Sequence, residues 1–109
     1  MDIKKHGDVT VIHVPLRFDA QTSREVDNAL QEIIKSSSKA VLCNFSHTDY
    51  ISSAGLRVLL SAAKELKKTD RQLYLCSISS FVQEVLDISG LTTILKIFKT
   101  EKDALGVIG

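Results

Sequence analysis

Residues 40–76 have the sequence AVLCNFSHTDYISSAGLRVLLSAAKELKKTDRQLYLC, in which the spacing of hydrophobic side chains changes along the chain. The apolar run 40–45 lies between polar segments and is typical of a strand that is buried on both faces. Residues 54–68 are rich in Ala, Leu and Lys, which favour a helix. After a polar turn at 69–72, residues 73–76 predict another buried strand. A strand, a helix and a strand in this order indicate a crossover between parallel strands.

The segment before residue 40 continues this alternation. Residues 9–14 are rich in β-branched side chains and end at Pro15, which predicts a strand, and Ile3 with its neighbours predicts a hairpin partner. From Thr22, apolar side chains fall on one face of a predicted helix. Thr22 or Ser23 is its expected cap, with Glu25 as the capping-box partner of Thr22.

The segment after residue 76 adds a helix, a strand and a helix. Residues 81–88 have helical spacing up to Gly90, residues 95–98 predict a last strand, and residues 101–107 predict a terminal helix. We therefore predict one α/β domain over residues 1–109. Its mixed, mainly parallel sheet of about four to five strands is packed by about four α-helices.

Composition excludes several classes of function. The chain has 109 residues, with 14 basic against 13 acidic side chains and a formal net charge of +1. Such a balance gives no electrostatic footprint for nucleic acid or an anionic membrane. The apolar runs are too short to span a bilayer, and no apolar stretch follows the charged N-terminus as in a signal peptide. We expect a cytoplasmic protein that neither binds nucleic acid nor inserts into a membrane.

Cysteines and histidines give no sign of a metal or cofactor site. Cys43 and Cys76 lie in apolar runs and are expected to be buried free thiols. The three histidines are scattered rather than placed at the spacing of metal ligands, and there is no CxxC pair. We expect no metal and no cofactor.

A pair of serines stands where a loop meets the start of the predicted second helix. Helix N-termini expose unpaired backbone N–H groups, so a phosphate on Ser52 or Ser53 would gain hydrogen-bond donors and a favourable dipole. Gly55 removes a side chain where backbone and phosphate would approach each other. Serine is also the commonest N-cap residue, so the same pattern fits a purely structural role.

The run Tyr50-Ile51-Ser52-Ser53-Ala54-Gly55-Leu56-Arg57-Val58-Leu59-Leu60 resembles the signature of the STAS domain family, the sulphate-transporter and anti-sigma-factor-antagonist module. Two weaker segments occur in the expected order. The run 16–19 is similar to an early loop of the family that holds an aspartate, and the run 91–98 followed by an acidic helix start is similar to its C-terminal part.

The resemblance implies a bacterial anti-sigma factor antagonist. In such systems the unphosphorylated domain binds an anti-sigma factor that is also a serine kinase, phosphorylation breaks the complex, and a serine phosphatase reverses the change. Ser53 matches the usual acceptor position, with Ser52 as the fallback, and Asp19, Asn44 and Gly55 are the implied neighbours. The implied partner-binding residues are Ser52, Ser53, Ala54, Leu56 and Arg57.

Two positions depart from the family pattern. The family usually has Asp immediately before the acceptor serine and at the end of the central strand, where this chain has Ser52 and Asn44. Loss of both carboxylates would reduce repulsion towards a phosphate and would remove groups that a kinase or phosphatase recognises.

Two other readings follow from the same residues. In a constitutive docking module or a regulatory subunit of a signalling or transporter ATPase complex, the serines would be caps only, and Arg57, Lys64 and Lys67 would form the contact surface. An enzyme is disfavoured because there is no GxSxG elbow, no phosphate-binding glycine loop and no evident triad. His47 is interpreted as a loop residue and Tyr50 as a packing or interface residue.

Overall fold

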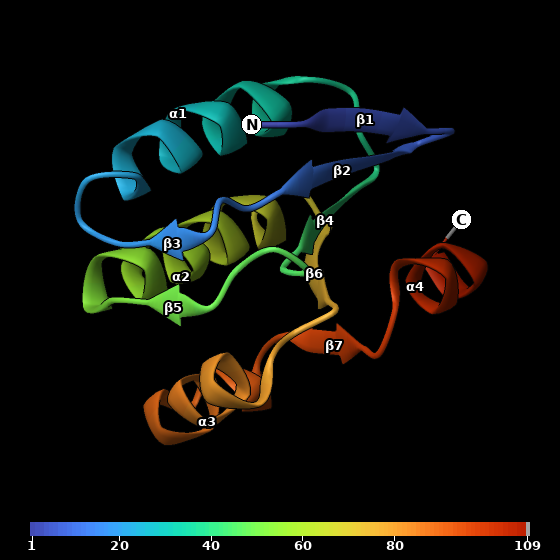
Figure 1. The fold of residues 1–109 in the computed structure, drawn as a ribbon. Coiled ribbons are helices and arrows are strands. Elements are labelled where there is room, and N and C mark those ends of the chain that lie inside the picture. Colours follow the sequence, from blue (N-terminus) through green and yellow to red (C-terminus); the bar gives the residue numbers. More distant parts are fainter. Residues whose placement is uncertain (109) are drawn as a thin grey trace.

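A five-stranded mixed sheet crosses the protein in the computed structural model, which describes residues 1–108 (Figure 1). Strand β1 (Ile3–His6) pairs antiparallel with β2 (Val9–His13), as the predicted hairpin requires. Three parallel strands follow in the order β4 (Ala40–Asn44), β6 (Gln72–Cys76) and β7 (Lys96–Phe98). The predicted mixed, mainly parallel sheet is confirmed.

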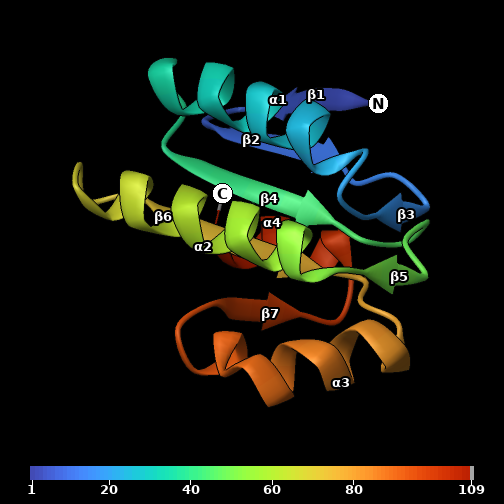
Figure 2. The same ribbon diagram turned by 90° about the vertical axis from the view of Figure 1, so that its left-hand side faces the viewer.

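Four helices pack on this sheet: α1 (Ser23–Lys35), α2 (Ser53–Lys67), α3 (Ser80–Ser89) and α4 (Glu101–Ile108). Helices α1 and α2 lie together on one face, whereas α4 lies on the other (Figure 2). Gly90 ends α3 in the left-handed conformation, with φ of 82°, as its place in the sequence predicts. None of the helices within residues 1–108 has both the length and the hydropathy needed to cross a membrane.

The central strand β4 separates two hydrophobic clusters because successive side chains point to opposite faces. Val41 and Cys43 contribute to the cluster under α1 and α2, whereas Ala40 and Leu42 contribute to the cluster under α4. All five residues of β4 are buried, as predicted. Cys43 and Cys76 are buried free thiols, and burial raises the pKa of both.

Two short strands were not predicted. Strand β3 (Arg17–Phe18) pairs in parallel with β5 (Tyr50–Ile51), so that Arg17 lies opposite Tyr50 and Phe18 opposite Ile51. A 3-10 turn over Leu91–Thr93 was also missed. Elements of two or three residues are too short to show a period in the sequence. The β3–β5 pair matters because β5 leads directly into α2.

The start of α1 corrects one prediction. Thr22 is the N-cap residue but makes no side-chain cap hydrogen bond, and no capping box forms with Glu25. Its hydroxyl instead donates to the carbonyl oxygen of Arg17 at 2.6 Å. The Asp19 carboxylate accepts from the backbone N–H groups of Gln21 and Thr22, at 3.0 and 3.1 Å. An Asx-type turn thus opens this helix.

Candidate functional site

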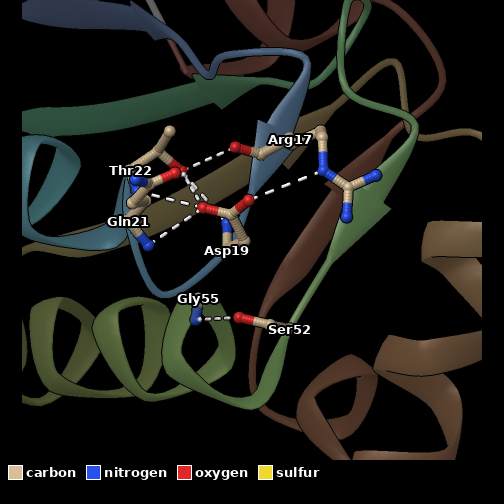
Figure 3. Close-up of polar contacts among 6 residues, drawn as sticks. All are labelled: Arg17, Asp19, Gln21, Thr22, Ser52 and Gly55. Atoms are coloured by element: carbon tan, nitrogen blue, oxygen red, sulfur yellow. Dashed lines mark hydrogen bonds and ion pairs between the residues drawn. The ribbon is translucent and has the colours of Figure 1, made fainter.

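The two serines at the start of α2 have different surroundings. Ser52 is the N-cap residue, with φ of −99° and ψ of 175°, and its Oγ accepts a long hydrogen bond of 3.4 Å from the backbone N–H of Gly55 (Figure 3). Ser53 is the first residue of the helix and is exposed, and its hydroxyl has no hydrogen bond to another of residues 1–108. Ser53 is therefore the hydroxyl that another protein can reach.

The β3–β5 pair fixes the position of this helix start. The backbone N–H of Ser52 donates to the carbonyl oxygen of Phe18 at 2.9 Å, which extends the ladder by one bond beyond β5. Phe18 is completely buried, and Ile51 is nearly so. The buried side chains of Phe18 and Ile51 and the backbone of residues 50–52 thus anchor the turn before Ser53.

Gly55 allows α2 to pack closely on β3. A Cβ at this position would lie 2.8 Å from the carbonyl oxygen of Phe18 and 3.0 Å from Cγ of Phe18 and Cγ1 of Ile51. Real Cβ contacts are essentially never shorter than 3.0 Å. The first turn of α2 lies directly on β3, and only glycine allows that distance, so packing by itself requires a glycine here.

Asp19 lies in the same corner but bonds to its own loop. Because Phe18 pairs with Ile51, the next residues along the two strands are Asp19 and Ser52. The Asp19 carboxylate accepts from Gln21 and Thr22 and lies 3.5 Å from Nε of Arg17 (Figure 3). The backbone hydrogen bond from Thr22 is the largest cause that lowers the pKa of Asp19, with smaller contributions from Gln21 and Arg17. Asp19 is a charged neighbour that organises its loop.

Asn44 does not join this cluster. By the alternation of β4 it points with Ala40 and Leu42 to the face covered by α4. Its Nδ2 donates to Oε1 of Glu101 at 2.8 Å, and its Oδ1 accepts from the backbone N–H of Ser46 at 2.8 Å. The expectation that Asn44 borders the switch serine is corrected, because a strand end exposes successive residues on opposite faces.

The other residues expected to bind a partner lie along the first turns of α2. Arg57 is exposed and follows Ser53 by four residues, so both occupy one face of the helix. Ala54 and Leu56 are partly buried, and Leu56 packs against the hydrophobic core. Ser53 and Arg57 are the exposed members of this set.

An exposed stack beside the serines was not recognised from the sequence. The Arg17 guanidinium carbon lies 4.3 Å from the centre of the Tyr50 ring. The Tyr50 ring in turn stacks on Phe81, with centroids 6.3 Å apart and planes inclined by 15°. From the sequence, only the interpretation of Tyr50 as a packing or interface residue indicated this stack. The three residues are distant in sequence and meet only in the tertiary structure.

His47 is exposed, as expected of a loop residue, and its ring centroid lies 6.2 Å from that of His13. His13 Nε2 lies 3.5 Å from Glu101 Oε1. No group of three or more His, Cys, Asp or Glu side chains within residues 1–108 could hold a metal ion.

Comparisons with known proteins identify the family. The family model described as the STAS domain matches residues 1–104, so this chain belongs to the STAS domain family. A protein named "Putative anti-sigma factor antagonist BtrV", of Bordetella bronchiseptica, is 31% identical over 86 residues, which cover 79% of this chain and 74% of the relative. The anti-sigma F factor antagonist of Paenibacillus polymyxa is 24% identical over 106 residues, covering 96% of this chain and 91% of that protein.

Solved structures agree on the fold. An anti-sigma factor antagonist of Mycobacterium paratuberculosis superimposes with a TM-score of 0.89 at 21% identity, over 97% of this chain and 90% of that one. The Bacillus protein SpoIIAA in its phosphorylated form gives a TM-score of 0.78 at 18% identity, over 99% and 98% of the two chains.

Proposed function

We propose that this protein is an anti-sigma factor antagonist whose unphosphorylated form binds an anti-sigma factor with serine kinase activity and thereby releases a sigma factor. Phosphorylation of Ser53 switches this binding off, and a serine phosphatase restores it. The observation that carries the proposal is an exposed Ser53 hydroxyl without a hydrogen bond to another described residue, on a helix start anchored by the β3–β5 pair, in a chain whose relatives bear this functional name.

The assignment of Ser53 rather than Ser52 rests on hydrogen bonding. Ser52 Oγ accepts from Gly55, and a phosphate there would disturb the N-cap of α2. A phosphate on Ser53 would stand in the first turn, near the positive end of the helix dipole, where it is tolerated without unfolding. Phosphorylation at Ser53 is therefore compatible with an unchanged fold.

The switch then acts by electrostatics at the interface. A phosphoserine adds about −1.5 to −2 charges at pH 7. Burial of that charge against a partner without paired cations weakens the complex through desolvation and repulsion. A change from almost fully bound to almost fully free requires roughly 5.5 kcal/mol of differential affinity. SpoIIAA, which has the same fold, has been solved in its phosphorylated form. This supports the proposal that the fold can accommodate a phosphate.

The proposal is tested with the anti-sigma factor kinase from the same organism. The protein is incubated with this kinase and ATP, added phosphate is located by mass spectrometry, and complex formation is measured before and after. We expect one phosphate on Ser53 and loss of the complex. Ser53→Ala is expected to bind and to remain unmodified, whereas Ser53→Asp is expected to bind more weakly.

Ser52→Ala is the matched control, since it removes the neighbouring hydroxyl and leaves the proposed acceptor. A kinase that modifies Ser53→Ala as fast as the parent protein would refute the assignment. Stable binding to an active kinase without any phosphorylation would instead identify a constitutive docking module.

A further inference from the structure

We propose that Arg17, Tyr50 and Phe81 form a docking surface for the anti-sigma partner, which we call the aromatic strip. The strip binds a partner segment that presents an apolar side chain next to a carboxylate. This inference rests on the proposed function and extends the contact from the helix start of α2 to the beginning of α3.

The strip is preassembled from three separate segments. Arg17 belongs to β3, Tyr50 is its register partner in β5, and Phe81 is the second residue of α3. The contact of 4.3 Å between Arg17 and Tyr50 and the stacking of Tyr50 on Phe81 hold the three side chains together. A surface that is ordered before binding loses less side-chain entropy when a partner arrives.

The strip is also unusually exposed for such large side chains. Phe81 is 49% exposed. The Arg17 side chain is 58% exposed although it is stacked on an aromatic ring. Aromatic residues and arginine are the side chains that contribute most to binding energy at protein interfaces. An exposed arginine and an exposed phenylalanine that share one tyrosine ring therefore fit a contact site.

Arg17 defines the chemistry of the partner. Asp19 lies against Nε at 3.5 Å, and within residues 1–108 the two terminal Nη atoms donate no hydrogen bond. These N–H groups form a fork that matches a carboxylate. Phe81, stacked on the same Tyr50 ring, provides exposed apolar surface, so a segment with an acidic residue next to a large apolar residue fits the strip.

The strip is continuous with Ser53. Strand β5 ends at Ile51, and Ser52 leads from it into Ser53, so Tyr50 precedes the proposed acceptor by three residues. The carbonyl oxygen of Phe18, one residue after Arg17, bonds to the N–H of Ser52. Three residues of chain span at most about 11 Å, so one partner interface of ordinary size can include both Ser53 and Tyr50.

The test measures the dissociation constant for the purified anti-sigma factor kinase with the parent protein, Arg17→Ala, Phe81→Ala and the double variant. We expect each single variant to bind about 10-fold more weakly, which corresponds to the loss of a typical strong interface contact. Because both side chains contact Tyr50, the double variant should lose less than the product of the two factors.

Two controls match the substitutions in exposure and type. Val107→Ala removes an apolar side chain that is 71% exposed on α4, and Arg24→Ala removes an exposed arginine on α1. Both should bind within twofold of the parent protein. Ser53 phosphorylation gives a second readout: the KM for Arg17→Ala and Phe81→Ala should rise by the same factor as the dissociation constant, with kcat unchanged.

The outcomes separate this inference from the proposed function. If the parent protein binds and is phosphorylated on Ser53 while both strip variants behave like it, the strip is not a docking surface and the proposed function stands. If the strip variants change only the oligomeric state of the chain, the strip is a self-contact and the inference is wrong. If the parent protein does not bind the kinase, both fail.

Discussion

Two polar clusters lie beyond the carboxyl ends of the parallel strands, and they are built in opposite ways. On the α4 side, Asn44, Glu101 and His13 direct their side chains at one another. On the α2 side, Ser53 is exposed beside the turn that follows β5, and its hydroxyl makes no hydrogen bond to another of residues 1–108. The first cluster uses its polar groups to attach a helix, whereas the second leaves a hydroxyl available. Polar residues near this edge of the sheet thus dock α4 in one case and, under the proposed function, are available to a partner in the other.

The largest change in stability is expected from Gly55→Ala, which alters the packing on the α2 side. A Cβ 2.8 Å from the Phe18 carbonyl oxygen pushes α2 away from β3 and should lower the free energy of unfolding by about 3 kcal/mol. Urea denaturation followed by circular dichroism measures the loss. Gly106→Ala in α4 is the control, because its Cβ meets nothing within 4 Å, and it should stabilise by up to about 1 kcal/mol. Equal stability of the two variants would contradict the packing role of Gly55.

Asn44→Asp should lower the free energy of unfolding by about 2 kcal/mol at pH 7, because it disrupts the polar cluster beside α4. The substitution removes the amide donor to Glu101 Oε1 and sets two carboxylates against each other at that distance. The loss should shrink as the pH falls towards about 4, where carboxyl groups take up protons. Glu101→Gln in the same variant should recover stability by restoring a donor. Ser53 phosphorylation should remain, and its loss would show that the two clusters are coupled.

Ser52→Ala should cost about 1 kcal/mol in the free energy of unfolding, because it removes the N-cap of α2. Ser53→Ala should leave the free energy of unfolding almost unchanged in the same urea denaturation, because the Ser53 hydroxyl makes no hydrogen bond to another described residue. This pair of variants separates the structural serine from the available one. The distinction would be lost if Ser53→Ala were the more destabilising.

The smallest effect concerns Asp19 and its dependence on pH. Its pKa is lowered in the folded protein, so its charged form contributes stability above the unfolded pKa, and this contribution is lost as the pH falls through the folded value. Asp19→Asn keeps an acceptor oxygen for Thr22 and removes the charge. The variant should therefore be less stable than the parent protein at pH 7 and close to it under acidic conditions. A difference independent of pH would show that the charge contributes nothing.

Periodicity and turn residues were enough to predict the main elements. The β-branched run before Pro15, the helical spacing after Thr22 and the buried run 40–45 each correspond to an observed element, and Gly90 ends α3 as expected. These elements follow from the sequence because each is long enough to show its period or carries a local stop signal. The motif around Ser52 and Ser53 likewise indicated a helix start, and α2 begins there.

Tertiary structure decided what the polar residues contact. The β3–β5 pair, two residues in each strand, sets Phe18 against Gly55 and explains the glycine. The faces of β4 separate Asn44 from Ser53, although both lie near the same end of the sheet. Arg17, Tyr50 and Phe81 meet from distant parts of the chain. Local sequence carries periodicity and caps, whereas a contact between distant residues exists only once the strands have taken their register.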